Sequence, residues 1–305
     1  MSITMYIIVT DTVSVWKITM KYQKLNNGIL IPKLGYGVYR IPENGKTKEC
    51  VLNALKAGYR HIDTAQAYYN EKEVGEAIKE SKIPRNEIFL TTKIWVSNFG
   101  DNKTYESFIK SLEKLGTDYV DLLLLHQPFN DYYGAWRDLE RIYKEGKAKA
   151  IGVSNFWPNR LVDLCGHCNI KPMVNQIEIN PFDQKELWRE INNKYGVVSE
   201  AWGPFAAGRN NMFGNETLLQ IAKNHNTGVA NVIIRYLLDN DIVVLSTTTK
   251  EERMKTNQDV YSFTLTNEEK EAIKSLDTKT SSFFNHESYQ AAEFFLSLEE
   301  ERKNK

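Results

Sequence analysis

The sequence alternates short apolar or β-branched runs with amphipathic helical stretches, and the alternation repeats about eight times. The expected strands are KLGYG, RHIDTA, IFLTTKIW, YVDLLLLH, AKAIGVSN, KPMVNQIE, VVSEAWG and DIVVLSTT. Strict alternation of strand and helix predicts parallel β-α-β units. Eight units whose strands are apolar enough to be covered on both faces favour closure into a barrel over an open sheet. We therefore predict an α/β fold of the (β/α)8 TIM-barrel type.

A hairpin pattern precedes these units. Asn27-Gly28 stands between two alternating apolar runs, which predicts an N-terminal β-hairpin with a type I′ turn. We expect residues 1–19 to form an extension outside the barrel and residues 20–305 to form one barrel domain, since no linker rich in Pro, Gly or Ser divides them. The first residues lack a basic segment and a small-residue cleavage site, so we expect neither a signal peptide nor a membrane anchor.

The charge balance argues against large anionic partners. Lys plus Arg and Asp plus Glu both number 39, so no net field favours nucleic acid or an anionic membrane. The three cysteines are too few for a disulfide framework and fit a reducing cytoplasm. We expect a small-molecule partner, no metal, and a monomer, with a dimer as the alternative.

Polar side chains stand near the ends of the expected strands. A buried strand has little structural use for such residues, and the carboxyl ends of barrel strands converge on the face that carries active sites. Each residue alone would be an ordinary structural residue, but their combination predicts one shared site. The residues are Asp63, Lys93, His126, Asn155, Gln176 and Glu178.

Five ordered motifs carry a family resemblance. HIDTAQAYYNE, TTKIW, LLLLHQP, GVSNF and VNQIEINP, in this order and at these intervals, resemble the aldo-keto reductase superfamily from Met20 to about residue 280. The resemblance implies a (β/α)8 barrel that binds an extended nicotinamide cofactor across its C-terminal face without a Rossmann domain. The sequence agrees, because no GxGxxG follows a strand.

The family's catalytic tetrad matches Asp63, Tyr68, Lys93 and His126. In the family pattern the Tyr stands five positions after the Asp, which selects Tyr68 over Tyr69 as the general acid. A hydride delivered to a carbonyl carbon builds negative charge on oxygen, which a proton donor must neutralise. We expect the Lys93 ammonium to lower the pKa of Tyr68, with Asp63 cancelling part of this effect. His126 is expected to hydrogen-bond the substrate oxygen.

The resemblance also implies the cofactor contacts. Ser154, Asn155 and Gln176 are expected to hydrogen-bond the nicotinamide carboxamide, and Trp202 to stack on the ring. Oxidoreduction of aldehydes and ketones with NADPH is therefore the predicted activity. A nicotinamide-binding regulatory or structural barrel protein with little turnover is the alternative, and the two differ in whether any carbonyl compound is reduced.

The phosphate-binding motif departs from the family pattern. Aligned on Arg253, the usual Pro, Lys and Ser become Ser246, Thr247 and Thr248, while Asn257 is kept. One cation is lost, but Arg253 retains the planar fork suited to a phosphate. We predict NADPH as the cofactor through Thr247, Thr248, Arg253 and Asn257, with NADH use left open.

The substrate pocket is expected to be lined by Tyr39, Trp95 and Gln127, of which Gln127 replaces a frequent Trp. Residues 208–216 and the tail after residue 280 occupy the places of the family's specificity loops.

A competing motif is CGHC at residues 165–168, the dithiol sequence of protein disulfide isomerases. A reactive dithiol works at the start of a helix, where the dipole lowers the thiol pKa. Here the motif follows the helical run NRLVDL, so we interpret it as a helix end.

Overall fold

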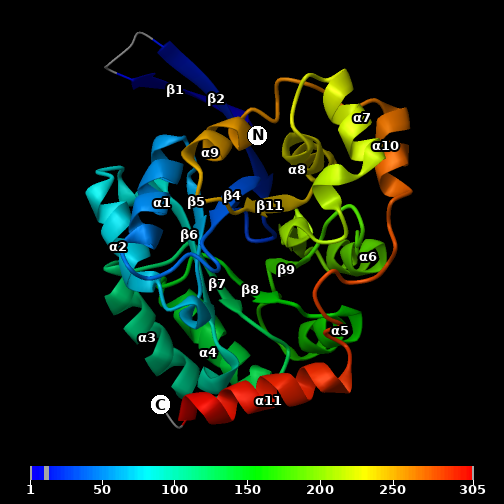
Figure 1. Ribbon diagram of the computed structural model, residues 1–305. Coiled ribbons are helices and arrows are strands. Elements are labelled where there is room, and N and C mark those ends of the chain that lie inside the picture. The colour runs from blue at the N-terminus through cyan, green and yellow to red at the C-terminus, as the bar shows by residue number, and fades with distance from the viewer. Residues whose placement is uncertain (1, 10–13, 304–305) are drawn as a thin grey trace.

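The protein folds as a closed barrel of eight parallel strands wrapped by helices (Figure 1). The computed structural model describes residues 2–9 and 14–303. The strands follow one another around the barrel in chain order, and β11 closes it by pairing with β4. Each predicted strand segment contains one barrel strand, so the predicted TIM-barrel fold is confirmed. The strands are β4 (Leu34–Gly37), β5 (His61–Asp63), β6 (Phe89–Ile94), β7 (Leu122–Leu125), β8 (Ile151–Ser154), β9 (Val174–Glu178), β10 (Val198–Trp202) and β11 (Val243–Ser246).

Amphipathic helices cover the outside of the barrel (Figure 1). They are α1 (Lys46–Lys56), α2 (Glu71–Glu80), α3 (Lys103–Leu115), α4 (Tyr132–Lys144), α5 (Pro158–His167), α6 (Glu186–Lys194), α7 (Glu216–Asn224), α8 (Val229–Asp239), α9 (Glu251–Gln258) and α10 (Asn267–Lys274). Short 3-10 turns also occur at η1 (Gln66–Tyr68), η2 (Arg85–Glu87), η3 (Val96–Asn98), η4 (Ala206–Gly208) and η5 (Met212–Gly214). The C-terminal helix α11 (Tyr289–Lys303) packs against η3.

The N-terminal segment forms a small antiparallel sheet. Strand β1 (Ser2–Val9) pairs with β2 (Ser14–Lys24), which pairs in turn with β3 (Leu30–Pro32). The β1–β2 hairpin projects away from the barrel in Figure 1. The expected boundary between residues 19 and 20 falls inside β2. The expectation that residues 1–19 lie outside the barrel domain stays a prediction.

The predicted type I′ turn at Asn27-Gly28 is wrong, although the β2–β3 hairpin is present. The strands are joined by five residues, 25–29. A type I′ turn needs positive φ at both central residues, and Gly28 has φ +91° whereas Asn27 has no positive φ. The reason is a tertiary contact, because the Asn27 side chain donates to Lys149 O at 3.0 Å and accepts from Ile29 N at 3.1 Å.

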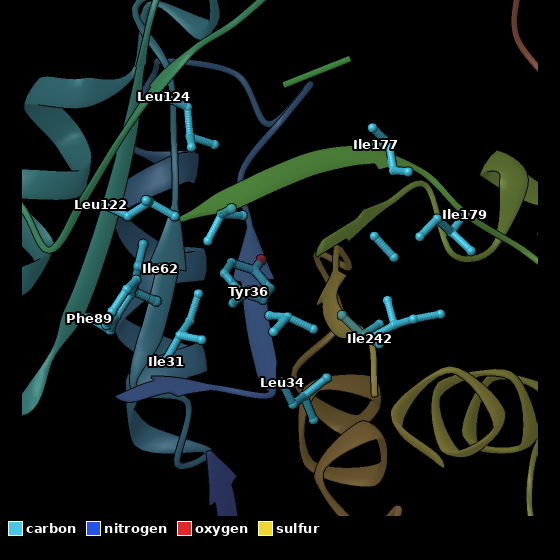
Figure 2. Close-up of a cluster of buried hydrophobic side chains, with 14 of the residues drawn as sticks. Ile31, Leu34, Tyr36, Ile62, Phe89, Leu122, Leu124, Ile177, Ile179 and Ile242 are labelled. Atoms are coloured by element: carbon cyan, nitrogen blue, oxygen red, sulfur yellow. The ribbon is translucent and has the colours of Figure 1, made fainter. Parts of the chain in front are cut away.

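Buried aliphatic and aromatic side chains make up most of the core, and Figure 2 shows one cluster that includes Ile31, Leu34 and Ile62. The barrel interior also holds polar side chains. Gly35 on β4 makes room for one of them, because a Cβ there would lie 2.7 Å from Nδ1 of His61. His61 is completely buried. The interior is thus arranged to accept polar groups.

Candidate active site

Lys93 on β6 is the centre of a buried polar cluster at the C-terminal ends of the strands. Its Nζ donates to Asp63 Oδ1 at 2.6 Å, to Thr64 O at 3.0 Å and to Tyr68 OH at 3.3 Å. These bonds use all three donors of an ammonium group. The Lys93 side chain is fully buried, so the cluster holds a charge that bulk water does not reach. Asp63 and Tyr68, which the sequence placed with Lys93, are brought into direct contact with it.

Tyr68 and its neighbour Tyr69 point to different environments. Tyr68 ends the turn η1, and its hydroxyl lies in the cluster. Tyr69 follows in the left-handed conformation with φ +59°, and its side chain is 60% exposed. The change of backbone direction at Tyr69 separates the two rings. Tyr69 is therefore a matched control for any role of Tyr68.

His126 follows β7 directly and faces Tyr68. Its ring lies edge-on to that of Tyr68, with centroids 5.6 Å apart, and to that of Trp95 at 5.2 Å. Tyr39 lies on another side of Tyr68, with ring centroids 4.9 Å apart. The four residues of the expected tetrad therefore lie together, and two of the expected pocket residues adjoin them.

The expected net lowering of the Tyr68 pKa is wrong. Burial raises the pKa of Tyr68 to about 12, and the opposing charge of Lys93 only partly offsets this effect. Burial also disfavours the charged form of Lys93, but the nearby Asp63 and Tyr68 outweigh it and raise the Lys93 pKa. Tyr68 is consequently a neutral phenol and Lys93 an ammonium at neutral pH.

Ser154, Asn155 and Trp202 form a second hydrogen-bonded group beside the cluster. Trp202 Nε1 donates to Asn155 Oδ1 at 2.8 Å. Asn155 Nδ2 donates to Ser154 Oγ and to His126 O, both at 3.1 Å. Asn155 has φ +61°, which an Asn tolerates better than most residues. The protein thereby fixes the orientation of the Asn155 amide.

Gln176 connects the Ser154–Asn155–Trp202 group to Asp63, the carboxylate that pairs with Lys93. Its Nε2 donates to Asp63 Oδ2 at 2.9 Å and to Glu200 Oε2 at 2.8 Å, while its backbone oxygen accepts from Ser154 Oγ at 2.9 Å. None of the residues that the structure describes donates to Gln176 Oε1. The N–H groups of a carboxamide ligand need acceptors, which Gln176 Oε1 and the remaining lone pairs of Ser154 and Asn155 supply. This set fits the N–H side of a nicotinamide carboxamide.

Glu200 is a buried residue of the cluster that the sequence analysis missed. It lies on β10 in register with Gln176 on β9 and is completely buried. Burial and the nearby charge of Asp63 raise the pKa of Glu200 to about 8. A glutamate inside the apolar segment VVSEAWG was the available signal, since a carboxyl group in a buried strand requires a partner.

The expected phosphate-binding residues lie around β11 and α9, and they differ in exposure. Thr247 Oγ1 donates to Gly37 O at 2.9 Å, and the Thr248 backbone oxygen accepts from Tyr36 OH at 2.6 Å. Arg253 is exposed in the first turn of α9. Asn257, in contrast, is buried, with its side chain against Tyr59. The Asn257 side chain thus has a contact within the protein that the sequence did not predict.

Lys250 is a second cation beside Arg253. It precedes α9 as the N-cap residue and is exposed. Residues three apart at the start of a helix lie near one another. The loss of the usual Lys at position 247 is thus accompanied by a Lys three positions later, and its sequence signal is the cation in TTTKEER.

The C-terminal helix completes the aromatic wall of the expected substrate pocket. Phe295 of α11 is buried, with its ring 5.0 Å from that of Phe129 and 5.8 Å from that of Trp95. Gln127 is also buried, and no donor among the described residues reaches its Oε1. The pocket neighbourhood therefore combines aromatic surfaces with an amide. The sequence signal for this contribution of α11 was the high number of aromatic residues in the tail after residue 280.

The CGHC motif lies at the C-terminal end of α5, as predicted. Cys165 is buried, and burial raises its pKa to about 12, while burial also raises the pKa of Cys168. Both thiols are therefore protonated and poorly nucleophilic at neutral pH.

The described residues contain no cluster of three or more His, Cys, Asp or Glu side chains suited to a metal ion. Within the same part of the chain, no helix combines the length and apolar character needed to cross a membrane.

Comparison with known proteins gives consistent matches. Residues 33–278 match the Aldo/keto reductase family. The chain is 44% identical over 256 residues to glyoxal reductase of Bacillus subtilis, covering 83% of this chain and 92% of that protein. It is 42% identical over 255 residues to 9,11-endoperoxide prostaglandin H2 reductase of Trypanosoma cruzi, covering 83% and 90%.

Solved structures agree. An aldo/keto reductase from Brucella melitensis matches with a TM-score of 0.81 and 41% identity, over 85% of this chain and all of that one. A Bombyx mori aldo-keto reductase in complex with NADP matches with a TM-score of 0.82 and 30% identity, over 87% and 95%.

A parallel barrel with a buried Asp-Lys-Tyr cluster at the C-terminal ends of its strands defines the class as a (β/α)8-barrel enzyme. With the sequence matches, the class narrows to one family. The chain belongs to the aldo/keto reductase family and is an oxidoreductase of that type.

Proposed function

We propose that this protein reduces aldehydes and ketones to alcohols with NADPH, and that Tyr68 donates the proton. The observation that carries the proposal is Lys93, whose ammonium contacts both Asp63 and the Tyr68 hydroxyl inside a buried cluster. The reduced nicotinamide, when bound, supplies the hydride that adds to the carbonyl carbon. The π electrons of the carbonyl move onto its oxygen, which then takes the proton from Tyr68.

The cluster supports this proton transfer through charge. Loss of the proton leaves a phenolate on Tyr68, and the Lys93 ammonium at 3.3 Å stabilises that negative charge as it forms. Asp63 keeps Lys93 in place and protonated. Because the Tyr68 pKa is about 12, the acid is fully protonated before the reaction. His126, whose ring faces Tyr68, orients the substrate oxygen toward the hydroxyl.

Cofactor binding is assigned to two groups of residues. Ser154, Asn155 and Gln176 hold the nicotinamide carboxamide, and Trp202 packs on the ring. The charge at the other end favours NADPH, because Lys250 and Arg253 supply two cations for the adenosine phosphate. Thr247 and Thr248 add polar groups at the adenosine-phosphate end of the site, and the buried Asn257 stabilises α9. Relatives solved with NADP and NADPH support the same cofactor.

The substrates are small carbonyl compounds that fit between Tyr39, Trp95 and Gln127. The relative named glyoxal reductase makes glyoxal a suitable first substrate. The test follows NADPH absorbance with glyoxal for wild type, Tyr68→Phe and Tyr69→Phe. We expect Tyr68→Phe to lose about 100-fold or more in kcat, since general acid catalysis contributes that much, and Tyr69→Phe to match wild type.

Two results would contradict the proposal in different ways. Equal activity in wild type and Tyr68→Phe would remove Tyr68 as the donor. Tight NADPH binding by wild type without oxidation by any carbonyl compound would instead favour a regulatory or structural barrel protein.

A further inference from the structure

The amide of Gln176 is held between two carboxyl groups inside the barrel. Both N–H bonds of its Nε2 are used, one toward Asp63 Oδ2 at 2.9 Å and one toward Glu200 Oε2 at 2.8 Å. All three side chains are nearly or completely buried. Asp63 already serves Lys93, but Glu200 has no part in the proposed proton transfer. The buried position of Glu200 next to the cluster therefore indicates a different role for this residue.

The two carboxyl groups favour one orientation of the Gln176 amide. If the amide rotated by half a turn, its oxygen would face Glu200 and the Asp63 carboxylate, and because Asp63 is paired with Lys93 and has no hydrogen to donate, acceptor would meet acceptor there. In the observed orientation Nε2 faces the carboxyl groups, and Oε1 stays available to a ligand. Without Glu200, one N–H of Gln176 would lose its acceptor in a buried place, which favours other side-chain conformations.

We propose that Glu200 is a positioning residue for the cofactor, which fixes the Gln176 amide so that its oxygen accepts from the nicotinamide carboxamide. The inference rests on the proposed function, since it assumes a nicotinamide at the Ser154–Asn155–Gln176 group. Glu200 itself touches neither the cofactor nor the substrate. It acts through Gln176, its in-register neighbour on β9.

The charge state of Glu200 gives this role a pH signature. The groups that face it are His61 and Asp63 on β5, Lys93 on β6, Gln176 on β9 and the apolar Val243 on β11. Burial lowers the pKa of His61 to about 3, the pKa of Lys93 is raised, and Asp63 is paired with Lys93. The Tyr68 pKa is about 12. Glu200, with its pKa of about 8, is the member of this set that gains charge as the pH rises from neutral to 9.

An ionised Glu200 places a negative charge beside Gln176. The oxidised nicotinamide ring carries a positive charge and the reduced ring does not. Ionisation of Glu200 therefore strengthens binding of NADP⁺ relative to NADPH. A carboxyl group remote from the nicotinamide would not produce this difference between the two forms of the cofactor.

The experiment titrates NADPH and NADP⁺ into the full chain and follows tryptophan fluorescence at about pH 6.5 and about pH 9. It compares wild type with Glu200→Leu, which removes the acceptor, and Glu200→Gln, which keeps a carbonyl acceptor but cannot ionise. Glu140→Gln is the control, because Glu140 is a buried carboxyl group that accepts from the backbone at Asn169 and Ile170, away from the cluster.

We expect Glu200→Leu to weaken NADPH binding about three- to tenfold, the effect of one misdirected hydrogen bond. Glu200→Gln and Glu140→Gln should stay near wild type at the lower pH. The ratio of the Kd for NADP⁺ to the Kd for NADPH should fall with rising pH in wild type and in Glu140→Gln, and stay constant in Glu200→Gln.

The proposal is overturned if Glu200→Leu binds NADPH as tightly as wild type, or if the ratio in Glu200→Gln changes with pH as it does in wild type. If Glu200→Leu does not fold, the pH comparison with Glu200→Gln decides alone. Because these readouts measure binding, they remain decisive even if wild type reduces no carbonyl compound, a result that would overturn only the proposed function.

Discussion

The two ends of the proposed cofactor site are built in opposite ways. At the catalytic end, Lys93, Asp63 and Gln176 are buried and bonded to one another before any ligand arrives. At the phosphate end, Lys250 and Arg253 are exposed, and neither forms an ion pair with a carboxylate among the described residues. The catalytic end is therefore preorganised, as charge stabilisation in a transition state requires, whereas the phosphate end depends on the ligand for its order.

The difference predicts different consequences of mutation. A change in the preorganised cluster disturbs several groups at once, so it should affect turnover and folding together. A change at the phosphate end should alter affinity and cofactor choice and leave the chemical step intact.

Lys93→Met should give the largest loss. It removes the charge that stabilises the Tyr68 phenolate, so kcat should fall about 100- to 10,000-fold. It also leaves the Asp63 carboxylate buried without its cation, which should lower the free energy of unfolding by about 3–5 kcal/mol. Steady-state kinetics and urea unfolding measure the two effects.

Lys33→Met is the matched control, because Lys33 forms an ion pair with the exposed Asp241 away from the cluster. It should keep full turnover. If Lys93→Met folds as stably as wild type and keeps its kcat, the catalytic end is not preorganised around the Lys93 charge.

Arg253→Ala should have a smaller and more selective effect. Loss of a charge-assisted contact with the adenosine phosphate should raise the Kd for NADPH about 10-fold, with little change for NADH. The kcat at saturating NADPH should remain near wild type. Fluorescence titration with both cofactors measures the change. An equal loss for NADPH and NADH would show that Arg253 does not distinguish the phosphate.

The pH dependence of reduction should be weak at the catalytic end. The reaction needs protonated Tyr68, and its pKa of about 12 means that this form persists as the pH rises from 7 to 10. The kcat at saturating NADPH should fall less than about twofold over this range through Tyr68. In Glu200→Gln the carboxyl group at position 200 can no longer titrate. A larger fall in kcat that persists in this variant would contradict the role of Tyr68 as the proton donor.

Removal of residues 1–19 should have the smallest effect. The β1–β2 hairpin projects from the barrel, and the family match begins at residue 33 (Figure 1). A chain that starts at Met20 should keep kcat and KM within about twofold of wild type, because chain termini outside the folded domain tolerate truncation. Loss of activity in the shortened chain would show that the hairpin belongs to the folded domain.

Local patterns explain why much of the site was predictable. Asp63, Lys93 and His126 stand within one residue of the ends of strands whose apolar runs are visible in the sequence, and parallel strand ends converge on one face. The family pattern, in which a Tyr stands five positions after the Asp, selected Tyr68, and the structure brings its hydroxyl to Lys93. Their catalytic roles remain proposals.

Other features depended on contacts between distant segments. Glu200 stands in a strand segment that is otherwise mostly apolar, so no partner for its side chain was evident from the sequence. In the structure Gln176 links it to Asp63, and this connection involves three different strands. Phe295 reaches Phe129 from the far end of the chain. The turn at Asn27 was changed by a bond to Lys149.

The sequence by itself determined the order of strands and helices and favoured closure of the barrel, because periodicity expresses these directly, and its family resemblance predicted Asp63, Tyr68, Lys93 and His126 as one site. Only the tertiary structure decided the Tyr68 pKa, the Gln176 orientation and the aromatic wall. Each of these depends on how far a group is desolvated and on which distant side chains surround it, and both quantities exist only once the barrel has closed.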